Sequence, residues 1–307
     1  MKDSSKTIII TFSDNKYFSL LKDLILSIKR FPQSKDISIG ILDGGLDDDQ
    51  IEYLKQHTSF IKKSEWDIKV DSSRIRGRDY LKNGVNRAFL PKYFPEFDKY
   101  IWLDCDTWIN DWIGIDFLIK GCDDGKLGVV PSIAPGYRDI GRVNWIFKSF
   151  ASVKTQNYKH AISSGFSNDI AKKIAFAPHL NAGVFSLEKK SKFWDRWRDL
   201  LNKAVSKGRI FASEQIAMNI AVYYEGLEAE FLPPTCNWIV DHLFPYFDEE
   251  KNCFVEPFLP NNKIGVIHLA SKIKGDENNI KSAEETIFDI KTLSKKIIKK
   301  SLRYTHN

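Results

Sequence analysis

Hydrophobic runs alternate with amphipathic stretches along the first hundred residues of the chain. Apolar runs bounded by turn residues predict buried strands at 7–12, 37–45, 66–70 and 99–106. Segments with a 3.6-residue apolar period predict helices at 17–30, 47–57 and 80–94, the last interrupted at Pro91. This alternation of strands and helices is typical of an open, mainly parallel α/β sheet covered by helices.

Four aspartates stand at the ends of the predicted strands: Asp14, Asp43, Asp104 and Asp106. Ligands of open α/β sheets bind beyond the carboxyl ends of the strands, so we expect these carboxylates to meet in one crevice. The second half of the chain is less regular. It holds a loop rich in glycine and basic residues at 136–142, which we expect to be a surface loop or a lid over the site.

The composition is that of a globular protein, with 307 residues, 43% of them hydrophobic and 28% charged. The net charge of +6 lies at the end of the chain. Residues 290–307 contain six basic residues and no acid, which leaves residues 1–289 formally neutral. A neutral body argues against nucleic-acid binding. We expect one domain at 1–289 followed by a basic tail at 290–307.

Apolar residues recur at helical spacing in this tail, with lysines on the remaining arc. The pattern predicts a basic amphipathic helix that contacts either an anionic membrane surface or the body of the protein. No stretch approaches the roughly 18 apolar residues of a spanning helix, and the start of the chain lacks a secretory pattern. The four cysteines have no metal-like spacing and suit a reducing compartment. We expect a cytoplasmic protein, peripheral on the inner face of the plasma membrane if the tail binds lipid.

A hydrophobic run carries Asp104 and Asp106 to its end. In an extended backbone, residues two apart face the same side, so both carboxylates can bind one ion. Carboxylate oxygens suit Mg²⁺ and Mn²⁺, which share their other positions with water and phosphates. His268 ends a later apolar run and is followed by Lys274 and Gly275, which suits a metal beside a diphosphate. The alternatives are turn residues for the aspartates and a structural histidine.

Five motifs follow one another between Thr11 and Gly275: SDNKYFSLLKDLILSI, NRAFLPKYFPEFDKYIWLDCD, HLNAGVFSL, SEQIAMN and HLASKIKG. They resemble the ordered motifs of the retaining glycosyltransferases of family 8, which include glycogenin and bacterial lipopolysaccharide galactosyl- and glucosyltransferases. Two positions depart from the family pattern in the last motif, where Ser271 replaces a glycine and Gly275 a proline.

The resemblance implies the GT-A fold and transfer of a sugar from a nucleoside diphosphate, usually UDP, with retention of anomeric configuration. It implies that Asp104, Asp106 and His268 hold Mn²⁺ or Mg²⁺. It also implies a set of donor contacts: Asp14 and Asn15 to the uridine, Arg87 and Asn181 to the donor, Lys274 with the adjacent Gly275 to the pyrophosphate, and Gln215 on the β-face of the sugar near the reacting carbon.

Retention requires either a carboxylate nucleophile or same-face attack guided by the leaving diphosphate. Gln215 is an amide, and Ile216 stands where the family usually has another acid, so Glu214 is the carboxylate that remains nearby. We favour same-face attack. Taken alone, Arg87 could form a surface ion pair, Asn181 could cap a turn, and Glu214 could be an ordinary acid at a helix start.

The function that we expect is transfer of a hexose, glucose or galactose, from a UDP-sugar to a glycan or to a lipid-linked acceptor of surface-polysaccharide or lipopolysaccharide synthesis. One alternative is a catalytically silent protein that binds nucleotide sugars or glycans. Another is a metal-dependent phosphohydrolase, which would need a water-activating base near the metal.

Overall fold

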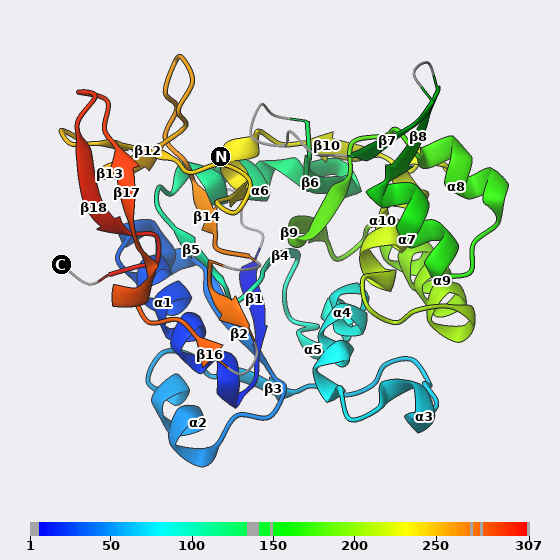
Figure 1. The fold of residues 1–307 in the computed structure, drawn as a ribbon. Coiled ribbons are helices and arrows are strands. Elements are labelled where there is room, and N and C mark those ends of the chain that lie inside the picture. Colours follow the sequence, from blue (N-terminus) through cyan, green and yellow to red (C-terminus); the bar gives the residue numbers. More distant parts are fainter. Residues whose placement is uncertain (1–5, 134–140, 148–149, 271–272, 277–278, 306–307) are drawn as a thin grey trace.

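A seven-stranded, mainly parallel sheet forms the centre of the molecule, in the order β10-β6-β9-β4-β1-β2-β3 (Figure 1). The computed structural model describes residues 6–133, 141–147, 150–270, 273–276 and 279–305. Strand β9 pairs antiparallel with β4 and β6, and the other neighbouring strands are parallel. This sheet confirms the predicted α/β class. Its strands are β1 (Thr7–Ser13), β2 (Ser38–Asp43), β3 (Phe60–Lys63), β4 (Lys99–Leu103), β6 (Leu127–Pro131), β9 (Leu180–Glu188) and β10 (Ala229–Phe231).

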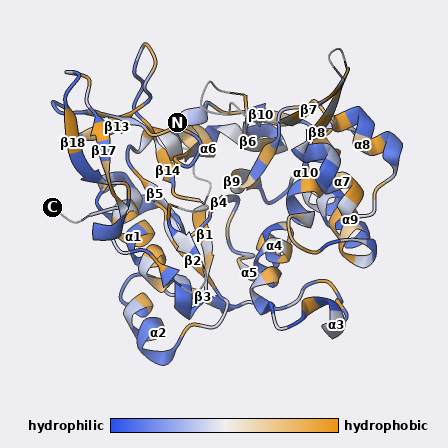
Figure 2. Cartoon of the chain, in the orientation of Figure 1, coloured by the Kyte–Doolittle hydropathy of each residue, from blue (hydrophilic) through white to orange (hydrophobic). Residues whose placement is uncertain are grey.

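Strand β1 is buried on both faces and contributes to two hydrophobic clusters. Ile8 and Ile10 pack into one cluster and Ile9 into the other, because successive side chains of a strand point to opposite faces. Figure 2 shows β1 in the orange of hydrophobic residues, while α1 and α9 alternate between orange and blue. The longer helices are α1 (Phe18–Lys29), α2 (Asp48–Lys55), α6 (Ile113–Gly121), α9 (Phe193–Lys207) and α10 (Ser213–Tyr223).

Local signals set the ends of the first two helices, which lie within the predicted ranges 17–30 and 47–57. Helix α2 begins with a capping box, in which the Gln50 backbone N–H donates to Asp47 over 2.9 Å and the Gln50 side chain accepts from the Asp47 N–H over 3.2 Å. Pro32 opens a short 3₁₀ turn just after α1. The segment predicted at 80–94 is helical but broken into α4 (Lys82–Asn86) and α5 (Leu90–Tyr93), with a 3₁₀ turn between them.

The strand that follows α2 lies earlier than predicted. Strand β3 pairs with β2 through residues 60–63, and residues 66–70 form no strand. Ile68 of that segment is nevertheless buried in the core, and Asp67 accepts hydrogen bonds from Tyr93 over 2.9 Å and Lys92 over 2.7 Å. The prediction of a strand at 66–70 was wrong because an alternating pattern also suits an irregular segment anchored by single side chains.

A second sheet links the end of β4 to the C-terminal half of the chain. It contains β5 (Thr107–Ile109), β14 (Val266–His268) and β11 (Trp238–Ile239). Strand β14 runs antiparallel to β5, and the register sets His268 opposite Thr107. The Leu269 N–H continues this pairing by donating to the Asp106 carbonyl over 2.9 Å. Strand pairing thus brings His268 beside the aspartates, although they are far apart in sequence.

The remaining elements surround these sheets. Strands β7 (Gly141–Phe147) and β8 (Phe150–Thr155) form a hairpin that leads into α7 (Gln156–Ser163). Trp145 of this hairpin is 72% exposed and Phe150 67%. The predicted loop at 136–142 lies largely outside the described residues, and its last two positions begin β7. Further elements are α3 (Ser72–Ile75), α8 (Asn168–Ile174), β12 (Tyr246–Asp248), β13 (Cys253–Val255), β15 (Gly275–Asp276) and β16 (Asn279–Ile280).

The C-terminal residues form a β-hairpin instead of the predicted amphipathic helix. Strand β17 (Ile287–Lys291) pairs antiparallel with β18 (Ile297–Ser301). Ile290 and Leu302 are fully buried, so the hairpin packs on the body (Figure 1, upper left). The predicted boundary between residues 289 and 290 falls inside β17.

The helix prediction was wrong because the same apolar spacing also fits a strand pair once the chain reverses. Lys295 lies in the reversal with a left-handed φ of 66°, which a continuous helix excludes. Ile290 and Ile298 then face each other across the hairpin. In the part of the chain that the structure describes, no helix has the length and apolar content to cross a bilayer.

Candidate active site

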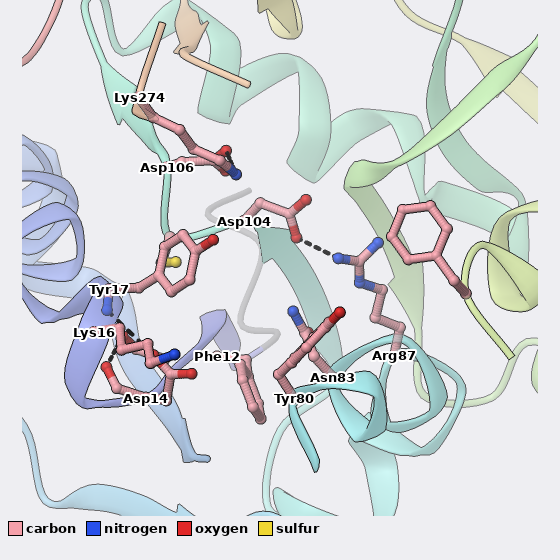
Figure 3. Close-up of a pocket in the computed structure, with 13 residues that line it drawn as sticks. Phe12, Asp14, Lys16, Tyr17, Tyr80, Asn83, Arg87, Asp104, Asp106 and Lys274 are labelled. Atoms are coloured by element: carbon pink, nitrogen blue, oxygen red, sulfur yellow. Dashed lines mark hydrogen bonds and ion pairs between the residues drawn. The ribbon is translucent and has the colours of Figure 1, made fainter. Parts of the chain in front are cut away.

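Two adjoining cavities open beyond the carboxyl ends of β1 and β4. One, the Asp14 cavity, measures about 410 Å³ and lies against the residues that follow β1. The other, the Gln215 cavity, measures about 430 Å³ and reaches α7 and α10. Figure 3 shows the Asp14 cavity, with Asp104 between Arg87 and the Asp106–Lys274 pair. The two cavities share Tyr80, Asn83, Arg87, Asp104, Asp106, Phe211 and Lys274.

A tight turn brings Asp104 and Asp106 together. The Thr107 N–H donates to the Asp104 carbonyl over 2.9 Å, which closes a turn between β4 and β5. The Asp104 N–H donates to the Gly183 carbonyl over 2.8 Å and ties this turn to β9. The two carboxylates do converge, as predicted, but the turn is the reason and not strand alternation. Cys105 between them packs against the hydrophobic cluster and also lines the Asp14 cavity.

Asp104 receives two hydrogen bonds on the same oxygen, Oδ1. Arg87 Nη2 donates over 2.6 Å and Trp102 Nε1 over 2.8 Å, so neither engages Oδ2. Arg87 is itself 7% exposed, and its Nη1 donates to the Ala182 carbonyl over 3.1 Å and to Glu214 over 3.3 Å. The arginine is therefore part of the site and does not form the surface ion pair that was its alternative.

Asp106 is 4% exposed and faces two basic side chains. Lys274 Nζ lies 2.5 Å from Oδ2, and His268 Nε2 lies 3.4 Å from Oδ1. Burial alone would raise the pKa of Asp106, but Lys274 and His268 hold it well below its usual value. Burial would lower the pKa of Lys274, and the Asp106 carboxylate outweighs this effect and raises it. The pair is therefore ionised at neutral pH.

Asp104, Asp106 and His268 form a cluster that suits a divalent cation, because one ligand atom of each lies within 4.8 Å of the others. His268 Nδ1 donates to Asn237 Oδ1 over 2.8 Å, which leaves Nε2 as the ligating nitrogen. Gly183 keeps the space open, because a Cβ there would lie 2.7 Å from Asp104 Oδ2 and 2.8 Å from His268 Cε1. This donor set fits Mn²⁺ or Mg²⁺.

Glu214 and Gln215 lie at the start of α10 and line the Gln215 cavity. Glu214 is 7% exposed, and burial raises its pKa while Arg87 opposes that shift. Gln215 is held from two sides, because its Oε1 accepts from the Ala182 N–H over 3.0 Å and its Nε2 donates to His179 Nε2 over 2.7 Å. The amide is thus fixed in one orientation at the cavity wall.

Asn181 lines the Gln215 cavity and also accepts from the Gly183 N–H over 2.9 Å, so it serves both in the site and in the turn. His179, two residues earlier, is a buried partner of Gln215 that sequence reasoning missed, and it is not among the residues that line the two cavities. Its Nδ1 donates to Asn157 Oδ1 over 2.6 Å, and burial lowers its pKa to about 3, which keeps the ring neutral. The motif HLNAGV contained this histidine, but nothing in its spacing linked it to Gln215.

Three residues predicted at the site are not among the described residues that line the two cavities. Asp43 accepts from two backbone N–H groups of the turn that follows it, both over 2.8 Å, and lines neither cavity. The Asn15 side chain turns to α2, where it donates to Asp47 over 3.2 Å and accepts from Gln50 over 3.1 Å. Gly275 stands in β15 with a φ of 90°, outside both cavities. Contact of Asn15 with the uridine and of Gly275 with the pyrophosphate stays a prediction from the motifs.

Asp14 does line its cavity, and its side chain accepts from the Tyr17 N–H over 3.1 Å. Beside it lie aromatic residues that carried no motif. The Tyr17 ring lies 5.3 Å from Lys274 Nζ, and burial raises the pKa of Tyr17. Tyr80 is 40% exposed and Phe211 51% exposed at the rim shared by the cavities. Exposed aromatics of this kind offer faces on which a planar base or a sugar can stack.

No protein-family model and no curated protein matches the chain. Solved glycosyltransferase structures do match it. The apo structure of the bifunctional glycosyltransferase WbbM superposes with a TM-score of 0.54 at 16% identity, over 89% of this chain and 47% of that one. The galactosyltransferase LgtC, solved with donor and acceptor sugar analogues, superposes with a TM-score of 0.50 at 14% identity, over 87% of this chain and 88% of that one.

At these identities the likeness shows the fold. The protein has the GT-A glycosyltransferase fold, with its candidate metal ligands beyond the end of β4. It spans about half the length of the WbbM chain that it matches. Membership of family 8 stays a prediction from the motifs.

Proposed function

We propose that the protein is a metal-dependent, retaining hexosyltransferase of family 8 that transfers glucose or galactose from a UDP-sugar to a glycan or lipid-linked acceptor. The observation that carries the proposal is the meeting of Asp104, Asp106 and His268 beside Lys274 in a glycosyltransferase fold. LgtC, of the same fold, was solved with donor and acceptor sugar analogues, which is consistent with the two adjoining cavities.

The residues around Asp106 are the ones that would bind the diphosphate of the donor. Asp104, Asp106 and His268 would hold Mn²⁺ or Mg²⁺, which when bound neutralises charge that develops on a departing diphosphate. Asn237 orients the His268 ring for this role. The Lys274 ammonium lies in the cavity wall, where it can bind a phosphate oxygen. Asp14 and Tyr17 line the same cavity, and the Tyr17 ring lies 5.3 Å from Lys274 Nζ, so both side chains can contact the nucleoside next to the diphosphate.

The residues that would bind the donor sugar line the Gln215 cavity. Gln215 and Asn181 line it with fixed amides that can bind sugar hydroxyls or the reacting face of the donor. Glu214 is buried and paired with Arg87, which opposes its use as a nucleophile. We therefore propose same-face attack in preference to double displacement.

We further propose that the protein works in the cytoplasm against the inner, anionic face of a membrane. Exposed apolar side chains of the β7–β8 hairpin, among them Trp145, and exposed basic side chains of the β17–β18 hairpin support this proposal. Trp145→Ser, and separately Lys295→Glu with Lys299→Glu, should each weaken co-sedimentation with vesicles that contain anionic lipid. Binding that neither change weakens, or no binding by the unaltered protein, would refute the proposal.

The test of the transferase is metal-dependent turnover of a UDP-sugar panel by the purified protein. Asp106→Asn should lower hydrolysis and transfer by roughly 100-fold, because one anchor of the charge-stabilising site is lost. Asp43→Asn is the matched control, since Asp43 also stands at a strand end but outside both cavities. Equal activity of Asp106→Asn and the unaltered protein would show that the site is misassigned.

The alternatives appear as other outcomes of the same assay. Tight UDP binding without turnover of any sugar nucleotide would favour a silent nucleotide-sugar binding protein. Metal-dependent release of phosphate from p-nitrophenyl phosphate would favour a phosphohydrolase.

A further inference from the structure

A third cavity, of about 210 Å³, lies beside the candidate active site and is lined by four arginines. Helix α3 and the turn after it contribute three of them, and the loop between α9 and α10 contributes the fourth. We call it the arginine cavity. Its lining residues are Arg74, Arg76, Arg78, Gly208, Arg209, Ile210 and Phe211, and no carboxylate is among them.

Backbone carbonyls accept hydrogen bonds from three of these guanidinium groups, those of Arg74, Arg76 and Arg78. Arg74 donates to the carbonyls of Ser206 and Gly208 and so ties α3 to the end of α9. Arg76 has a left-handed φ of 52° and is followed by Gly77 at 72°, so the chain reverses there. Arg78 Nε donates to a carbonyl of α3 over 3.2 Å. Carbonyl oxygens thus orient Arg74, Arg76 and Arg78. Hydrogen bonds from Ser73 lower the pKa of Asp71 at the start of α3, and Arg74 is close enough to lower it further.

Charge around this cavity is unbalanced. Within the described ranges, none of the four arginines forms an ion pair with a carboxylate, whereas Arg87, Arg196, Arg198 and Arg303 elsewhere in the chain all do. An arginine keeps its charge at every physiological pH, and like charges around a small cavity repel one another. A bound anion would relieve that repulsion, and the planar guanidinium fork suits phosphate and carboxylate groups.

The arginine cavity adjoins the Gln215 cavity. Ile210 and Phe211 line both the arginine cavity and the Gln215 cavity. Arg209 stacks on the Phe211 ring at 5.0 Å, so the cation lies at the border of the two. A ligand with a hydroxyl near Gln215 can therefore extend past Phe211 and place an anionic group among the arginines.

We propose that the arginine cavity binds an anionic group of the acceptor, a phosphate or a carboxylate, so that the acceptor is an acidic saccharide or a sugar phosphate. This inference rests on the proposed transferase function and specifies its acceptor. Arg74 ties α3 to the end of α9, so it is left unchanged in the test. Arg76 and Arg209 are exposed, and they are the ligand-binding cations that can be substituted without disturbing the fold.

The probes are glucose 6-phosphate, glucuronate and glucose, titrated by saturation-transfer NMR in the presence of UDP and Mg²⁺ to occupy the diphosphate side. The unaltered protein should bind glucose 6-phosphate or glucuronate at least tenfold more tightly than glucose, and the better of the two identifies the anion. Arg76→Gln with Arg209→Gln should remove that preference. Arg196→Gln with Arg198→Gln, on α9, is the control of equal charge change and should keep it.

Equal binding of all three probes by the unaltered protein, or an anion preference that survives Arg76→Gln with Arg209→Gln, would overturn the inference. UDP-sugar hydrolysis is measured on the same samples. Hydrolysis without an arginine-dependent anion preference would overturn the acceptor assignment alone. An arginine-dependent preference without hydrolysis of any UDP-sugar would support the anion site and refute the transferase.

Discussion

Lys274 and Asp106 form an ion pair at the point where the two cavities meet, with the carboxylate side chain 5% exposed. Arg87 forms the corresponding pair with Asp104. Two adjacent aspartates thus avoid mutual repulsion because each has a cation from a distant segment. A divalent ion would have to share these carboxylates with the same two cations.

Lys274→Ala should destabilise the metal-free protein, because Asp106 would remain buried without its cation at a cost of about 3 kcal/mol. Mn²⁺ should then raise the unfolding temperature of this variant more than that of the unaltered protein, since no lysine competes for the carboxylate. Thermal unfolding with EDTA and with Mn²⁺ measures both effects. Lys120→Ala, an exposed lysine of α6, serves as control, and equal Mn²⁺ shifts in Lys274→Ala and the unaltered protein would contradict the prediction.

His179 should make stability depend on pH. Its pKa is about 3 in the folded protein, because of burial, and about 6.5 in an unfolded chain. The unfolded state takes up the proton first, so this contribution is complete above pH 6.5 and is lost as the pH falls toward 3. Between pH 7 and pH 5 the free energy of unfolding should fall by about 2 kcal/mol more than in His179→Gln, measured in urea. Parallel pH profiles of the two proteins would refute the assignment.

At the scale of elements, pairing between β5 and β14 assembles the candidate metal ligands. His268 lies opposite Thr107 in that pairing, and Gly183 of β9 borders both Asp104 and His268. Position 183 therefore has to lack a side chain for the ligands to keep their places.

Gly183→Ala should lower Mn²⁺ affinity at least tenfold, because the new Cβ would displace Asp104 Oδ2 and His268 Cε1. Gly40→Ala is a matched control in β2, where the Cβ would lie 2.8 Å from Ile8 Cδ1 in the core. Both changes should cost about 1–3 kcal/mol of stability through overpacking. Calorimetric titration with Mn²⁺ distinguishes them, and equal affinities in the two variants would be evidence against the role of Gly183.

The predictions of helices and strands succeeded where the local sequence pattern was compatible with only one kind of secondary structure. The buried apolar run at 7–12 was compatible only with a strand, and the 3.6-residue period at 47–57 only with a helix. They failed at 66–70 and at the C-terminus, where the pattern was compatible with more than one structure. Ile68 and Ile290 are buried as their apolar character requires, but neighbours distant in sequence decided the backbone that buries them.

At the scale of the whole molecule, the C-terminal hairpin belongs to the body. Trp108 Nε1, on β5, donates to the Leu302 carbonyl over 2.8 Å, and Arg303 pairs with Asp23 of α1 over 2.6 Å. The basic residues of the tail are therefore presented by a packed hairpin and not by a free helix.

Truncation after Asp289 should destabilise the protein by about 4 kcal/mol or more, because Ile290 and Leu302 leave the core. Truncation after Thr305 is the control and should leave stability unchanged. Thermal unfolding and size-exclusion chromatography report the result. A folded, equally stable protein without residues 290–307 would show that the hairpin is an appendage.

The chain order of hydrophobic runs established the α/β class, and the residue types after each run established which side chains could bind metal and phosphate. These properties depend on neighbours a few positions away, so they can be read along the chain. The pairing of Asp106 with Lys274, of Gln215 with His179 and of Asn15 with α2 depended on the packing of distant segments. The arginine cavity is of the same kind, because α3 meets the end of α9 only in the folded molecule. Contacts between residues far apart in the sequence cannot be recognised from residue spacing, because only the fold brings these residues together.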